Sequence, residues 1–155
     1  MLASAVLILA LAACATSPFD PYQSEVAELG PADALRQPSR AGAQVIWGGR
    51  IAAIGNREGW SEIEVVALPL GRADRPRENA EGGVRFVIVH SGFLDPMIYE
   101  PGREVTALGT FREIETRRVG EFPVDMPVLV SRQIELWPIE RRGNTGFSIG
   151  VGIGL

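Results

Sequence analysis

Apolar and polar residues alternate along much of the chain, and this period of two is typical of β-strands with one buried face. The clearest stretch is Trp60–Gly71, where acidic residues at 62 and 64 alternate with Ile63 and Val65. Four other stretches are rich in Val, Ile, Leu and Phe, and they cover 44–55, 84–91, 103–115 and 127–139. The segments between the five stretches leave no room for a long helix, so the pattern predicts an all-β fold.

Five short strands favour a small barrel. Gly48 and Gly49 fall inside the first stretch, and glycine within a strand marks a bulge or a sharp bend. An OB-like barrel matches the spacing, because this fold has five strands and a connection between the third and the fourth. A β-sandwich is the alternative. The charged segment 117–124 predicts a loop, and the prolines at both ends of the last stretch predict an edge strand.

The chain begins with an apolar run from Met1 to Ala13 that only Ser4 interrupts. A helix needs about 20 apolar residues to span a bilayer, whereas a signal-peptide core is shorter. The run therefore predicts a signal peptide over residues 1–13. It ends at Cys14, which is the chain's one cysteine. An exported protein meets an oxidising compartment, where a free thiol invites mispairing and an acylated cysteine does not.

The sequence Leu-Ala-Ala-Cys at 11–14 resembles the lipobox of bacterial lipoproteins. The resemblance implies that Cys14 receives a diacylglycerol, that the chain is cut between Ala13 and Cys14, and that the new amine is acylated, for example with palmitate. Three acyl chains would hold the protein at a membrane, since each buried methylene contributes about 0.8 kcal/mol and one chain binds only marginally. Ala15 follows, and by the same resemblance the absence of aspartate there indicates the outer membrane.

Four prolines at 18, 21, 31 and 38 follow the cysteine. Prolines at this density prevent a long helix and predict a lipidated tether over residues 14–42, with one short helical turn around Glu25–Leu29. The folded β-barrel domain is then expected at 43–139. Residues 140–155 alternate glycine with apolar residues, and we expect a loosely ordered Gly-rich tail or an extra edge strand there.

The composition excludes several kinds of partner and site. The chain has 155 residues, a net charge of −4, one histidine and no lysine. Its arginines are scattered among acidic residues, so we expect no nucleic-acid partner. With so few nitrogen and sulfur ligands we expect neither a metal nor another cofactor. The expected partners are the membrane, through the N-terminal lipid, and an envelope protein or a glycan.

The side chains with catalytic potential do not form a recognisable active site. His90 and Ser91 are neighbours on a predicted strand, so their side chains point to opposite faces, and no nucleophile elbow surrounds the serine. Asp95 precedes a proline and is expected to start a turn. Glu62 and Glu64 are typical of a solvated strand face. We therefore expect no catalytic residues and no enzyme.

Three tryptophans are the candidate ligand-facing residues: Trp47, Trp60 and Trp137. OB-like barrels bind single strands or sugars through aromatic side chains on one face. Packing in the core or at an interface is the more common role of each such residue, and the ligand-facing role is the less common one. Because the chain has no basic groove, the expected ligand is a glycan or peptidoglycan.

The stretch Ser-Gly-Phe-Leu-Asp-Pro at 91–96 places two apolar residues in a turn-rich connection, where polar residues are typical. We expect Phe93 and Leu94 to plug one end of the barrel, with Asp95 capping the turn.

Several of these segments together resemble the Slp family of Gram-negative outer-membrane lipoproteins. They are the lipobox at Cys14, WGGRIAAI at 47–54, EIEVVALPL at 62–70, SGFLDP at 91–96 followed by Tyr99, VTALGT at 105–110 and IELWP at 134–138. The resemblance implies an outer-membrane location with the anchor facing the periplasm and an association with starvation or stress, and it carries over no catalytic residue. We therefore expect a non-enzymatic envelope module anchored through Cys14, with a periplasmic glycan-binding module as the alternative.

Overall fold

The computed structural model describes residues 16–139, and within them five strands close into a barrel. The strands are β1 (Gln44–Arg57), β2 (Trp60–Ala67), β3 (Arg85–Ser91), β4 (Glu104–Val119) and β5 (Phe122–Leu136). Around the barrel they run in the order β1-β2-β3-β5-β4, and β4 pairs with β1 to close it. The β3–β5 pairing is parallel and the others are antiparallel. This five-stranded closed barrel confirms the OB-like fold and excludes the sandwich.

The β4–β5 hairpin is longer than the sequence pattern predicts. The expected loop at 117–124 is the tip of two paired strands, and Val119 pairs with Phe122 across a two-residue turn. Gly120 has a φ of +60°, which this tight turn requires and which glycine adopts without strain. The expectation was wrong because the many charges here lie on an exposed hairpin and not in a loop. The fifth strand is also not an edge, since β5 pairs with both β3 and β4.

The glycine pair in β1 allows close strand approach. Residue 49 pairs with Ala67 on one side and Val105 on the other. A Cβ atom on Gly49 would lie 2.0 Å from the Val66 carbonyl oxygen, so no larger residue fits. The register shift in the β1–β2 pairing falls between Ile51 and Ala53, a few residues after the glycines. The irregularity was therefore expected in the right strand, but it lies a few residues after Gly48 and Gly49, where it was expected.

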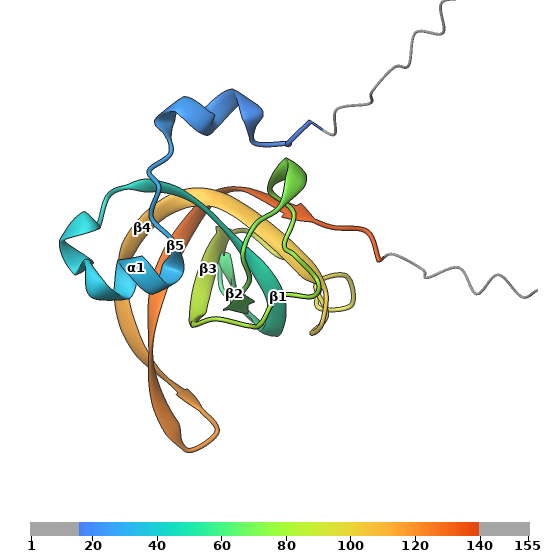
Figure 1. Ribbon diagram of the computed structural model, residues 1–155. Helices are drawn as coiled ribbons and strands as arrows, with labels where there is room; N and C mark the ends of the chain where they lie inside the picture. Colours follow the sequence, from blue (N-terminus) through green and yellow to red (C-terminus); the bar gives the residue numbers. More distant parts are fainter. Residues whose placement is uncertain (1–15, 140–155) are drawn as a thin grey trace, which may run out of the picture.

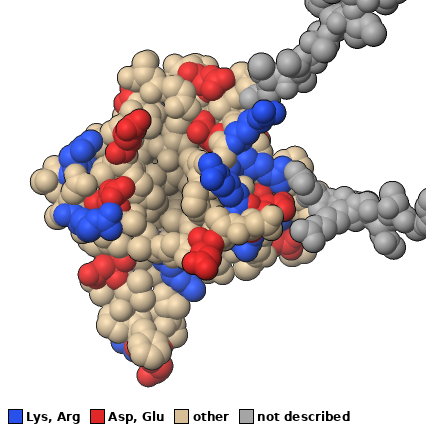
Figure 2. Space-filling model, viewed as in Figure 1, with Lys and Arg blue, Asp and Glu red and all other residues tan. Residues whose placement is uncertain are grey.

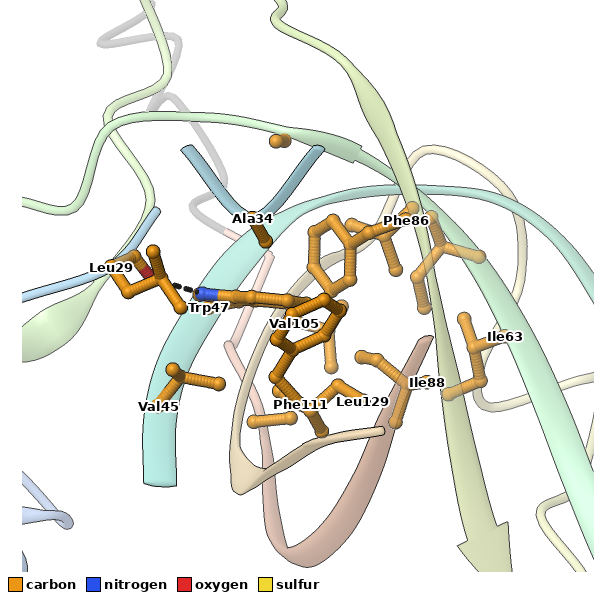
Figure 3. Close-up of a cluster of buried hydrophobic side chains, with 14 of the residues drawn as sticks. Leu29, Ala34, Val45, Trp47, Ile63, Phe86, Ile88, Val105, Phe111 and Leu129 are labelled. Carbon is orange, nitrogen blue, oxygen red and sulfur yellow. Dashed lines mark hydrogen bonds between the residues drawn. The ribbon is translucent and has the colours of Figure 1, made fainter. Parts of the chain in front are cut away.

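The barrel interior is built around Trp47, which is fully buried (Figure 3). Its ring centroid lies 5.5 Å from that of Phe86 in an edge-to-face arrangement and 5.7 Å from that of Phe111. Its Nε1–H donates to the Leu29 carbonyl at 2.6 Å, so the polar end of the indole is satisfied inside the core. Trp47 is a core residue, and its assignment as a ligand-facing aromatic was wrong.

The segment before β1 packs on the barrel and differs from the expected tether. Phe19, Leu29 and Ala34 are buried. Pro21, Pro31 and Pro38 start short helices, because each lies in the first turn, where its missing N–H costs nothing. These are the 3₁₀ helix Asp20–Glu25, α1 (Pro31–Arg36) and the 3₁₀ helix Pro38–Arg40, and the loop after β2 holds a further 3₁₀ turn, Arg72–Asp74. One of these helices thus ends where the helical turn was expected to begin, at residue 25, and two follow the expected place at 25–29.

Both ends of the described chain leave from one side of the barrel, while the tip of the β4–β5 hairpin points away from them (Figure 1). None of the helices within residues 16–139 is long and apolar enough to cross a membrane. The predicted signal peptide, Ala13, Cys14 and the Gly-rich tail lie outside the described residues.

Candidate functional site

The outer face of β2 and β3 carries a groove, which we call the tryptophan groove, with a cavity volume of about 410 Å³. It is lined by Gly59, Trp60, Glu62, Val89, Ser91, Arg112, Val130 and Ser131. Because side chains alternate along β2, Trp60 and Glu62 face outwards while Ser61 and Ile63 face the core. Trp60 is 43% exposed, whereas the neighbouring inward residues are fully buried. The groove therefore presents one large aromatic surface to solvent.

A second apolar cluster forms beside the groove, outside the main core. Val87, Met126 and Val128 are fully buried in it, and the half-buried Val119 and Val124 pack against them. These residues come from β3 and from the β4–β5 hairpin, so the hairpin covers part of the outer face of the barrel. The groove is consequently bounded by the hairpin as well as by the sheet.

An ion pair ties the hairpin to β2 at the groove. Arg117 donates to the Glu62 carboxylate at 3.0 Å and to that of Glu115 at 2.7 Å. The hydrogen bond from Arg117 lowers the pKa of Glu62 below its usual value, against the opposing effect of burial. The same carboxylate accepts a long hydrogen bond of 3.4 Å from Trp60 Nε1, which orients the indole. Glu62 is thus a paired, positioning side chain and not part of a freely solvated face.

His90, Ser91 and Asp95 do not assemble into a catalytic group. His90 Nδ1 lies 2.9 Å from Ser131 Oγ, and the Ser131 hydroxyl donates to the Val89 carbonyl at 3.2 Å. Burial lowers the pKa of His90, so the imidazole is neutral at pH 7. Asp95 accepts from the Met97 amide at 2.9 Å and caps a turn, as the sequence predicts. Within residues 16–139, no group of three or more His, Cys, Asp and Glu side chains could hold a metal ion.

The connection at 91–96 is only partly a plug. Leu94 is buried, while Phe93 is 72% exposed. The backbone of Leu94 is held on both sides, since its N–H donates to Ser61 Oγ at 2.9 Å and its carbonyl accepts from Asn56 Nδ2 at 3.1 Å. With Leu94 turned into the core, the preceding side chain faces solvent. The expectation that Phe93 plugs the barrel was therefore wrong.

A polar hollow, which we call the arginine pocket, lies near the end of β5 and has a cavity volume of about 340 Å³. Its lining is Arg50, Arg75, Glu78, Asn79, Gly102, Arg103, Glu104, Trp137, Pro138 and Ile139. Trp137 is half-buried there, and its Nε1–H donates to Thr106 Oγ1 at 2.9 Å. The Arg75 guanidinium lies 5.8 Å from the centre of the Trp137 ring. Trp137 thus forms a wall of this pocket and takes no part in the tryptophan groove.

Sequence reasoning missed the arginine pocket, because its three arginines come from distant segments and each looks isolated along the chain. For the tryptophans a signal was present. Trp60 shares its alternation with the charged residues at 62 and 64, which predicts an outward side chain, while Trp47 shares its alternation with Val45. Reading that parity would have separated the exposed tryptophan from the buried one.

The fold and its surfaces define a small barrel with an aromatic groove on its outer face, which is the architecture of an OB-type barrel. The model of the outer membrane lipoprotein Slp family matches residues 11–149, and the chain belongs to this family. The resemblance found in the sequence is confirmed. Family membership and the names of its relatives place the protein at the outer membrane of Gram-negative bacteria.

Two curated relatives come from Escherichia coli (strain K12). The uncharacterized lipoprotein YeaY is 25% identical over 101 residues, which cover 65% of this chain and 52% of that protein. Outer membrane protein Slp is 27% identical over 108 residues, which cover 70% of this chain and 57% of that protein. The chain thus spans about half the length of the curated relatives it matches.

Solved structures similar to the barrel include a small single-stranded DNA-binding protein from Streptomyces coelicolor. Its TM-score is 0.42 at 12% identity, covering 61% of this chain and 94% of that one. Plasmodium falciparum SSB in complex with ssDNA has a TM-score of 0.31 at 14% identity, covering 61% and 91%. At these scores neither structure carries an argument about what this chain binds.

Proposed function

We propose that this protein is a non-enzymatic, lipid-anchored module of the periplasmic envelope, cleaved between Ala13 and Cys14 and acylated on Cys14. The Leu-Ala-Ala-Cys sequence and the family of lipoproteins support the anchor. Maintenance of the envelope under stress is the role that we infer for it. The observation that carries the proposal is the packing of residues 17–19 on the barrel, only a few residues after the acylated position.

Three contacts hold this start of the chain. Ser17 Oγ donates to Asp74 at 2.5 Å, and the Phe19 amide donates to Ser17 Oγ at 3.0 Å. Gln23 Nε2 donates to the same Asp74 oxygen at 2.8 Å, and the side chain of Phe19 is fully buried. Three residues span at most about 10 Å from Cys14 to Ser17. An acylated Cys14 would therefore hold the barrel directly at the bilayer surface and not at the end of a long tether.

The anchor is tested by Cys14→Ser. This variant should lose incorporation of a labelled fatty acid and disappear from the outer-membrane fraction, because a serine hydroxyl is not a substrate for thioether formation. Ala15→Ser is the matched control, since it changes the neighbouring residue and keeps the thiol. Fatty-acid labelling of the Cys14→Ser variant at the level of the control would show that the anchor lies elsewhere.

The exposure of Trp60 favours a second function, the binding of a glycan strand such as peptidoglycan in the tryptophan groove. A sugar ring can stack its C–H face on the half-exposed indole, which Glu62 orients. Ser91, Arg112 and Ser131 line the same groove and offer hydrogen bonds to hydroxyl groups. The volume lies in the range of ordinary ligand pockets. Its paired charges and apolar floor suit a neutral, hydroxyl-rich ligand.

Binding to purified peptidoglycan tests this second function. Trp60→Ala should bind about tenfold more weakly, since removing an aromatic anchor from a binding site costs more than about 1 kcal/mol. Phe122→Ala is the control, because it removes an exposed aromatic ring at the tip of the β4–β5 hairpin that does not line the groove. Equal binding by Trp60→Ala and the unmodified chain would exclude the groove as the glycan site.

A further inference from the structure

Among residues 16–139, the lining of the arginine pocket holds three arginines and two glutamates. Both of its carboxylates pair with one arginine: Arg75 lies 3.1 Å from Glu104 and 3.6 Å from Glu78. The other two arginines bond to backbone carbonyls. Arg50 donates to the Glu78 carbonyl at 3.4 Å, and Arg103 donates to the Ile98 carbonyl at 3.1 Å. A neutral carbonyl satisfies a donor but leaves the charge uncompensated, so the pocket favours an anion.

Arg103 also carries an unused donor. Its second terminal nitrogen donates to the Trp137 carbonyl at 2.9 Å, yet its Nε is buried without a hydrogen-bond partner among residues 16–139. Buried N–H groups almost always have a partner, and leaving one unpaired costs free energy. Arginine matches the oxygen geometry of phosphate with several N–H groups at once. The buried Nε itself lies out of reach of a ligand, and the three arginines that line the pocket are the groups suited to a phosphate.

Exposed apolar side chains lie beside this pocket. Ile139 lines it and is largely exposed. The connection between β3 and β4, whose backbone Arg103 binds at Ile98, exposes Phe93, Met97 and Ile98. Apolar side chains next to basic ones are typical of surfaces that enter the headgroup region of a bilayer. Basic and apolar side chains next to each other suit a lipid surface better than a purely polar ligand, which would have no use for the apolar ones.

A series of hydrogen bonds links this region to the start of the described chain. Ser17 binds the Asp74 carboxylate, and the Asp74 carbonyl accepts from Thr106 Oγ1 at 2.8 Å. Thr106 in turn accepts from Trp137, the wall of the pocket. The β3–β4 connection and both chain ends lie on the same side of the barrel (Figure 1). Charged side chains of both signs gather beside the points where the chain ends leave (Figure 2).

We propose that this side of the barrel docks on the lipid surface, with a headgroup phosphate in the arginine pocket and the exposed side chains of Phe93, Met97 and Ile98 between the lipids. Its orientation rests on the anchor proposed above, because a lipid on Cys14 would bring this side to the membrane. The docking itself uses only residues of the folded barrel and should persist without the lipid.

The test is sedimentation of the mature chain from residue 14, carrying Cys14→Ser, with vesicles of phosphatidylethanolamine and phosphatidylglycerol. The chain should bind these vesicles. Arg50→Gln and Phe93→Ser should each weaken binding about fivefold, since one basic or one inserted apolar side chain contributes about that factor. Arg50 is suited to the test because its side chain makes one long hydrogen bond, of 3.4 Å, to the described part of the chain, so its loss should leave the fold intact.

Matched controls lie on the β4–β5 hairpin, away from the chain ends. Phe122→Ser removes a phenylalanine that is 75% exposed, and Arg118→Gln removes an arginine bonded to the Glu121 carbonyl. Neither should change vesicle binding. Absence of vesicle binding, or equal loss in the hairpin variants, would overturn the proposal. If the chain bound inorganic phosphate but not vesicles, the pocket would be a site for a free anion, and this result would also overturn the proposal. The anchor proposal is tested separately by fatty-acid labelling of Cys14, so a failure of the docking proposal would leave it standing.

Discussion

The tryptophan groove and the arginine pocket are built from similar residues and differ in how their charges are compensated. In the groove, Arg117 bonds to two carboxylates, those of Glu62 and Glu115. In the pocket, Arg50 and Arg103 bond to backbone carbonyls of the described residues. Paired charges position other groups and need no ligand, while uncompensated charges favour an anion. This difference is the reason why we propose a neutral ligand for the groove and a phosphate for the pocket.

The largest effect should come from disrupting the packing of the N-terminal segment, which hydrogen bonds through Asp74 and Thr106 connect to the arginine pocket. Phe19→Ala removes a fully buried ring and should lower the free energy of unfolding by about 3–5 kcal/mol in thermal or denaturant unfolding. Phe122→Ala, at the exposed hairpin tip, should change it by less than about 0.5 kcal/mol. Equal stability of the two variants would return residues 14–42 to the role of a tether.

A smaller effect should follow from breaking the ion pair at the groove. Glu62→Gln should lower stability by about 1 kcal/mol, because the pair is half-exposed and screened. The lowered pKa of Glu62 means that its contribution is present above the usual carboxyl pKa and is lost as pH falls through the lower folded value. Unfolding measured against pH should therefore show a weaker acid dependence in the variant. An unchanged acid dependence would contradict this role.

The smallest effect should be the one that His90 has on the pH dependence of stability, and it separates the tryptophan groove from the arginine pocket. Burial lowers the pKa of His90, so the unfolded chain binds the proton more readily, and stability should decline as pH falls below about 6.5. His90→Gln should flatten the stability profile between about pH 7 and 5. Vesicle binding through the arginine pocket should stay constant over that interval, since guanidinium groups do not titrate there. A histidine-dependent change in vesicle binding would show that the two surfaces are coupled.

Local patterns predicted most of the barrel, and long-range contacts account for what they missed. The alternation around Ile63 and Val65 placed β2 correctly, because a strand with one buried face shows its period in any short window. The hairpin tip was missed since its charges pair across strands, as when Arg117 reaches Glu62 on β2. The N-terminal segment was missed because burial of Phe19 depends on a barrel surface distant in sequence.

By itself, the sequence determined the strand content, the OB-like barrel and the family, because each rests on contiguous residues whose spacing carries the signal. The alternation also carried a signal for an outward Trp60 and an inward Trp47, whereas only the tertiary structure decided where the arginines converge. Trp47 and Trp60 lie on adjacent strands, yet one is enclosed when β4 and β5 close the barrel and the other remains outside. Arg50, Arg75 and Arg103 share a pocket because chain closure brings three separate segments together. No local period encodes that meeting, since it depends on strand register and on the path of the connecting loops.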